Sequence, residues 1–104
     1  MEKSKILSML GLARRAGKLS MGHDAAAGSI RSGKAEMLFL ACDLSDRAVS
    51  DMRFISGKFS PSLSVFRADD ISTADIYSAC GYKAGIITVN DKNFARKIIS
   101  LTGK

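Results

Sequence analysis

GKLSMGHDAAAGSIRSGKAEMLFLACD, residues 17–43, contains one complete helix-and-strand unit of this chain. A loop leads to a short helix, where His23 or Asp24 occupies the N-cap position ahead of three alanines. Gly33 follows the last helical residues, as the glycine that ends a helix commonly does. The run 37–42 is apolar throughout, which is typical of a central strand covered on both faces. The unit therefore predicts a buried sheet with a helix packed on it.

The same element types alternate along the rest of the chain. Apolar periodicity and capping residues predict helices over about 4–16, 24–32, 46–56, 73–80 and 91–102, and strands over 19–21, 37–42, 63–66 and 85–89. We expect Gly57 to stop the third helix and Phe59 to extend its apolar stripe. With linkers this short, residues 1–104 are expected to form a single α/β domain, a three-layer α/β/α sandwich with a small mixed four-stranded sheet.

Positive charge is concentrated in the N-terminal third of the chain. The whole chain has a formal net charge of +6, and residues 1–34 hold seven Lys or Arg against two acidic residues. Such clustering favours a polyanionic partner, with nucleic acid first and anionic lipid second. The alternative is a chain that is merely basic and soluble.

Basic residues flank the helix predicted over 24–32, namely Lys18, Arg31 and Lys34. The N-terminus of a helix offers free backbone N–H groups and a partial positive charge, so cations beside it favour a bound phosphate. We therefore expect this segment to present a nucleic-acid-binding edge.

Tyr82 and Lys83 lie on the loop before the last predicted strand. Two interpretations of this pair remain open. The aromatic ring can stack on an unpaired base while the lysine contacts a phosphate. Alternatively, the tyrosine is partly buried and covers the end of the sheet.

No residue pattern predicts catalysis or a bound cofactor. His23 is the single histidine, and no Ser or Cys occupies a nucleophile motif. Residues 28–35 read GSIRSGKA, which is close to a phosphate loop, but Ala35 replaces the magnesium ligand and the motif precedes a strand instead of following one. No cysteine or histidine spacing matches a metal site. The sequence therefore predicts no enzyme, no metal, no cofactor and no small-molecule substrate.

Cys42 and Cys80 lack the spacing of a disulfide framework, which indicates thiols in a reducing compartment. No segment reaches the ~18 consecutive apolar residues of a membrane span. The apolar stretch after Lys5 is too short and too interrupted for a signal peptide. We expect a cytoplasmic protein with no membrane partner.

Three longer motifs together resemble one family. They are A-x-R-A-G-K-L at 13–19, I-R-S-G-K-A at 30–35 and V-x-D-K-x-F-A-x-K-I at 89–98. They resemble the kink-turn-binding ribosomal protein superfamily, which includes archaeal and eukaryotic large-subunit ribosomal proteins and Gadd-type relatives, and above all its small bacterial branch of YlxQ-like proteins. The resemblance runs nearly from end to end. It implies an α/β/α sandwich that binds RNA, typically a kink-turn with sheared G·A pairs, and that is associated with the ribosome.

Carried over position by position, the resemblance implies a weakened base-reading site. Gly22 matches the glycine that opens the family's second helix, and Asp24 stands where asparagine is usual. Ala25 replaces a glutamate and Gly28 replaces a lysine, which in the family read guanine edges. Loss of both contacts implies RNA binding with reduced specificity for kink-turns.

The residues expected to contact RNA combine the charge argument with the resemblance. They are Lys18, Gly22, His23, Asp24, Gly28, Arg31, Lys34, Tyr82 and Lys83. The alternative is a protein-interaction module on the same fold that binds no RNA, for which the alanine-rich helix offers a smooth surface.

Overall fold

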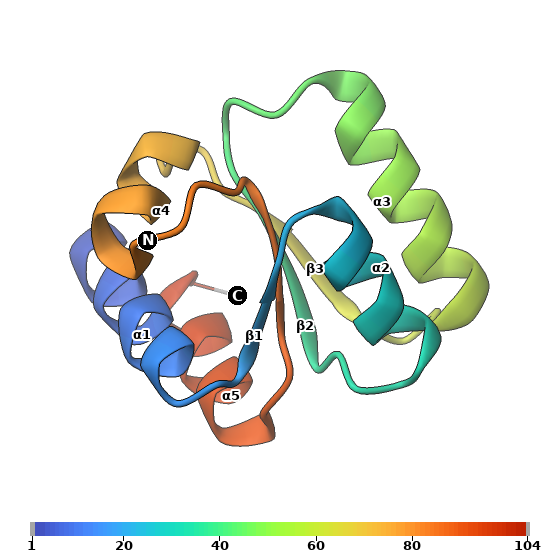
Figure 1. The fold of residues 1–104 in the computed structure, drawn as a ribbon, viewed down its shortest axis with the longest axis horizontal. Helices are drawn as coiled ribbons and strands as arrows, with labels where there is room; N and C mark the ends of the chain where they lie inside the picture. Colours follow the sequence, from blue (N-terminus) through green and yellow to red (C-terminus); the bar gives the residue numbers. More distant parts are fainter. Residues whose placement is uncertain (1, 104) are drawn as a thin grey trace.

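The structure, a computed structural model, describes residues 2–103. Within this range, five helices alternate with four strands (Figure 1). The elements are α1 (Lys3–Arg15), β1 (Leu19–Met21), α2 (His23–Arg31), β2 (Met37–Leu40), α3 (Asp46–Phe59), β3 (Ser64–Arg67), α4 (Thr73–Cys80), β4 (Ile86–Val89) and α5 (Lys92–Leu101). None of the helices in this range is both long enough and apolar enough to pass through a bilayer.

The four strands form one mixed sheet in the order β1-β4-β2-β3. β4 is antiparallel to both β1 and β2, whereas β3 runs parallel to β2. Leu19, Val89 and Met37 lie in one row across β1, β4 and β2, which sets the register of the sheet. The sheet is therefore small, mixed and four-stranded, as the sequence predicts, and β1 is an edge strand.

Helices cover both faces of this sheet, which confirms the predicted three-layer architecture (Figure 1). α1, α4 and α5 lie on one face, and α2 and α3 lie on the other. Phe39 of β2 packs with Ile6 in the first core, while its neighbour Leu38 packs with Ile30 and Met52 in the second. Successive strand residues point to opposite faces. A strand with helices on both sides therefore needs apolar residues at every position.

α2 begins one residue earlier than predicted, and its N-cap is Gly22 instead of His23 or Asp24. Gly22 has φ 98° and ψ 163°, a conformation that a residue with a Cβ adopts only with strain. Its N–H donates a 2.8 Å hydrogen bond to the carbonyl of Ile86 in β4. The chain thus turns from the sheet edge into the helix within one residue. The backbone geometry of that turn, and not a capping side chain, decides which residue occupies the N-cap.

The other end of α2 closes as predicted at Gly33, which has φ 77°. The N–H of Gly33 donates to the carbonyl of Ile30 at 3.2 Å, and the N–H of Lys34 donates to the carbonyl of Ser29 at 2.9 Å. These two bonds form a Schellman motif, in which a left-handed glycine reverses the chain and satisfies the last helical carbonyls. The motif returns the chain directly to the sheet.

The prediction that Gly57 stops the third helix is wrong, because α3 continues to Phe59. A helical glycine costs only about 1 kcal/mol relative to alanine, so the packing of α3 overrides it. The helix ends where Ser60 precedes Pro61, since a residue before proline is disfavoured in the helical region. Phe59 therefore lies on a last turn beyond the core and is 45% exposed, instead of extending the buried stripe.

Ser45 is a typical N-cap residue in the sequence, whereas Ser72 or Thr73 and Asn90 or Asp91 are alternatives for the last two helices; the structure confirms Ser45 and selects Ser72 and Asp91. The side chains of Ser45, Ser72 and Asp91 each accept a backbone N–H from three residues ahead, at 3.1, 3.2 and 3.0 Å. The strand predicted over 37–42 is shorter, since β2 ends at Leu40. Residues 41 and 42 continue the apolar run but not the strand. The backbone N–H of Cys42 donates a 2.8 Å hydrogen bond to the carbonyl of Ile71, which lies outside the sheet.

Candidate nucleic-acid interface

The start of α2 and the loop before β4 meet at one end of the sheet. Because Gly22 pairs with Ile86, the first residue of β4, the loop that precedes β4 lies beside the start of α2. An open depression of about 370 Å³ is lined by Met21, Gly22, His23, Asp24, Ala25 and Tyr82. The structure therefore brings together four of the residues predicted as a site, although Tyr82 lies about 60 positions from the other three in the chain.

The α2 N-terminus offers backbone donors that the protein itself does not use. The N–H groups of the first three helical residues have no partner within a helix, since the first α2 bond runs from Ala26 to Gly22 at 3.0 Å. The N-cap glycine supplies no capping side chain. His23 and Asp24 are exposed, and the imidazole Nδ1 lies 3.2 Å from the Asp24 Oδ1. The tip can therefore hold an anion, with Asp24 turned to its neighbouring histidine.

Tyr82 lies on the surface of this depression and is 47% exposed. The guanidinium carbon of Arg14, in the last turn of α1, is 5.4 Å from the centroid of its ring. That distance falls within the range of a cation–π contact. The half-exposed ring is thus contacted at the surface by a cation from α1.

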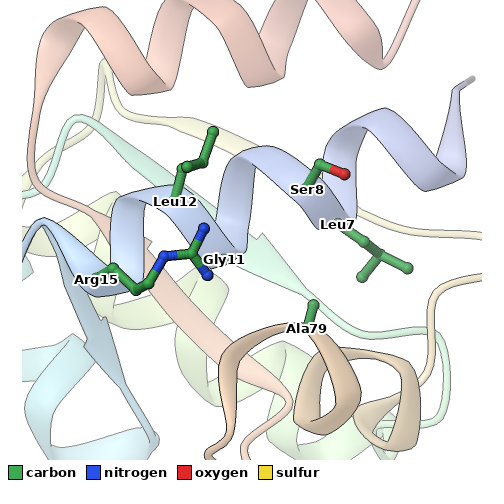
Figure 2. Close-up of a pocket in the computed structure, with 6 residues that line it drawn as sticks. All are labelled: Leu7, Ser8, Gly11, Leu12, Arg15 and Ala79. Atoms are coloured by element: carbon green, nitrogen blue, oxygen red, sulfur yellow. The ribbon is translucent and has the colours of Figure 1, made fainter.

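Arg14 is a candidate interface residue that the sequence does not reveal. It reaches Tyr82 only because α1 and α4 pack closely: a Cβ on Gly11 would lie 2.8 Å from the carbonyl oxygen of Ala79. Figure 2 shows this contact, with Gly11 facing Ala79 and the side chain of Arg15 lying along the same side of α1. The local sequence signal for Arg14 is only its place in the last turn of a helix.

Lys18 and Lys34 lie at the opposite end of the sheet from Gly22. Lys18 precedes β1 and accepts a 2.8 Å backbone hydrogen bond from Asn90, which follows β4. Lys34 follows α2, whose nine residues span about 13 Å. Because β1 and α2 run in opposite directions, the residue before the strand and the residue after the helix meet at the same end (Figure 1). The expectation that these cations surround the N-terminus of the helix is therefore wrong: they lie at its C-terminal end.

Arg31 also lies at the C-terminal end of α2, where its guanidinium carbon is 5.6 Å from the centroid of the Phe59 ring. Exposed cations thus gather along both ends of α2 and on the loop before β4, namely Arg14, Lys18, Arg31, Lys34 and Lys83. Within residues 2–103, none of these five forms an ion pair within 4.0 Å. Cations without a carboxylate partner are available to a polyanion.

A partly buried polar cluster joins α2 to the sheet. The hydroxyls of Ser20 in β1 and Ser29 in α2 are 2.6 Å apart, and the Asn90 amide donates to Ser20 at 2.9 Å. Ser29 is 7% exposed, so its hydroxyl depends on this contact. The cluster joins β1, α2 and the end of β4, which fixes the two ends of the interface relative to each other.

The geometry gives His23 no catalytic partner in the part of the chain described. Its ring contacts an exposed carboxylate and no Ser or Cys nucleophile. No group of three or more His, Cys, Asp or Glu within residues 2–103 is arranged to hold a metal ion. Displaced pKa values lie elsewhere: a bond from the backbone N–H of Thr73 lowers the pKa of Asp43, and burial raises the pKa of Cys80.

Comparisons with known proteins find one curated relative and similar solved structures. No family model matches it. Among solved structures, a protein of unknown function from Bacillus halodurans is 25% identical, with a TM-score of 0.86 over 96% of this chain and 98% of that one. A 15.5kD RNA binding protein from Giardia lamblia is 13% identical, with a TM-score of 0.76 over 97% of this chain and 84% of that one, which is a likeness of fold. RNA-binding protein YlxQ from Enterococcus faecium is 30% identical over 96 residues, or 91% of this chain and 88% of that protein. This chain therefore belongs to the YlxQ family.

Proposed function

We propose that this protein is a single-domain cytoplasmic RNA-binding protein, associated with the ribosome, that uses α2 and the loop before β4 to contact structured RNA. The observation that carries the proposal is the depression in which the free amides of the α2 tip meet Tyr82, whose ring lies beside the guanidinium of Arg14. Backbone N–H groups at a helix start suit a phosphate, and an exposed ring suits an unpaired base. Its YlxQ relative is named for RNA binding and not for a reaction, which supports the proposal.

Contacts to the RNA backbone dominate in this proposal. The exposed face of α2 carries Ala25, Gly28 and Ser32, which offer no long acceptor or cation to a base edge. Exposed cations at both ends of the helix face phosphates instead, and such contacts position RNA without reading its sequence. We therefore infer that kink-turns are bound with low selectivity and that affinity falls steeply with salt.

Two exposed tyrosines provide a matched test of the site. Tyr82 is 47% exposed beside the α2 tip, and Tyr77 is 55% exposed on α4. Loss of one stacked base costs about 1–3 kcal/mol, so Tyr82→Leu should weaken binding to a structured ribosomal RNA fragment by roughly fivefold or more. Tyr77→Leu should leave it unchanged. Equal RNA affinities of the two variants would show that Tyr82 does not contact RNA. If gel shifts retain no RNA at micromolar protein and ~100 mM salt, RNA binding itself is refuted.

A protein-interaction module is the alternative function, and one observation favours it. A groove of about 410 Å³ between α1 and α4 is lined by Leu7, Ser8, Gly11, Leu12, Arg15 and Ala79 (Figure 2). Leu12 is 45% exposed there, which leaves apolar surface in water. Three results together would establish this alternative. The protein binds no RNA, its complex with a partner protein survives treatment with ribonuclease, and the variant Leu12→Asp no longer forms that complex.

A further inference from the structure

Near the C-terminal end of α2, an exposed phenylalanine lies beside two cations from different helices. The Lys58 Nζ is 5.3 Å and the Arg31 guanidinium carbon is 5.6 Å from the centroid of the Phe59 ring. Both distances are near the outer limit of a cation–π contact, so neither cation covers the ring closely. The ring accordingly remains 45% exposed. We call Arg31, Lys58 and Phe59 the α3 platform.

The fold holds the α3 platform in place. α2 and α3 pack side by side through Ala27, Ile30 and Ile55, and both helices end at the same end of the sheet (Figure 1). The last turn of α3 continues past Gly57 before Pro61 ends it, and this turn carries Lys58 and Phe59. The platform therefore exists only because the helix passes its glycine.

The charges of the α3 platform are not balanced by acidic side chains. Neither Arg31 nor Lys58 forms an ion pair within 4.0 Å in the part of the chain that the structure describes. The negative ends of α2 and α3 suffice to hold the two cations there. This interaction with the helix ends does not explain why the apolar Phe59 ring beside the two cations is left exposed. A half-exposed aromatic ring with two such cations over it offers the groups that bind an unpaired base and its phosphates.

We propose that the α3 platform is a second RNA contact, which stacks on an unpaired base of a single-stranded segment while Arg31 and Lys58 take the adjacent phosphates. The inference rests on the proposed RNA binding and extends it to single-stranded flanks. Along α2, exposed Ala25 lines the Tyr82 depression and exposed Gly28 follows it, one turn before Arg31 of the platform. A single-stranded RNA segment that runs along α2 would thus contact Tyr82 first and the α3 platform second.

The chain contains no tryptophan, so Phe59→Trp introduces a single fluorescent reporter. Titration with oligouridylate should quench its emission, because a stacked base lies against the indole. Phe54→Trp is the matched control, since Phe54 is 69% exposed on the same helix and contacts neither Arg31 nor Lys58 as a cation–π partner. Its emission should not change with oligouridylate.

Affinity provides the second measurement. Phe59→Leu should weaken binding to a hairpin with a single-stranded flank by roughly tenfold, and leave binding to the blunt hairpin unchanged. Equal emission changes in the two tryptophan variants, together with wild-type affinity of Phe59→Leu, would overturn the α3 platform while RNA binding stands. Failure of the wild-type protein to bind either hairpin would instead refute the proposed function. Quenching by polyglutamate and not by oligouridylate would assign the platform to an acidic peptide.

Discussion

Two side chains added to α2 should give this protein a preference for kink-turns. The change is Ala25→Glu with Gly28→Lys, which supplies the acceptor and the cation that the resemblance to kink-turn-binding proteins implies at these positions. Both residues are exposed and three positions apart, so they lie on one face of the helix. A Cβ added at Gly28 meets no atom within 4 Å. The helix can therefore accept both side chains without repacking.

The expected gain in discrimination follows from the number of added contacts to base edges. Each contact to a base edge contributes about 1–3 kcal/mol of discrimination, so two contribute at least roughly 2 kcal/mol, or about thirtyfold. The replacement of Gly28 also stabilises the helix by up to about 1 kcal/mol, because glycine is a poor helix former. Gly28→Ala controls for that effect, since it stabilises the helix without adding a cation.

The assay compares dissociation constants for a kink-turn RNA and for the same RNA with Watson–Crick pairs in place of its sheared G·A pairs. We expect the ratio of the two constants to rise in the double variant and to stay at the wild-type value in Gly28→Ala. A folded double variant with the wild-type ratio would refute the reasoning, because it would show that RNA does not approach the 25–28 face of α2.

The remaining predictions concern charge, backbone strain and pH. Lys34→Ala should weaken binding evenly across RNA sequences and reduce the slope of log affinity against log salt by about 0.7–0.9. The control variant Lys97→Ala, on α5, should leave this slope unchanged. Equal slopes for the two variants would exclude Lys34 from phosphate contact. Gly22→Ala should destabilise the fold by at least about 1 kcal/mol in urea unfolding, because alanine is strained at φ 98°; unchanged stability would contradict that conformation. Asp43→Asn should lower the melting temperature most at neutral pH. The hydrogen bond from Thr73 holds the folded-state pKa of Asp43 below 3.8, so its stabilisation is complete above that pH and disappears as pH falls through the lowered pKa; a difference that grows in acid would reverse this sign.

The order and type of the secondary-structure elements follow from the sequence because their signals are local. Ser45, Ser72 and Asp91 cap helices through hydrogen bonds that span three residues. The apolar run at 37–40 requires a strand covered on both faces, wherever its partners come from. The charge imbalance of the N-terminal third likewise requires no tertiary information.

Only the tertiary structure decided which surface residues meet. Strand order brings Tyr82 beside the α2 tip, and close packing of α1 on α4 brings Arg14 to its ring. Packing also carries α3 past its glycine and so places Phe59 beside Arg31. Each of these contacts joins residues far apart in the chain, where no capping rule or periodicity acts. They are set by the burial of the two cores on either side of the sheet, a property of the whole molecule.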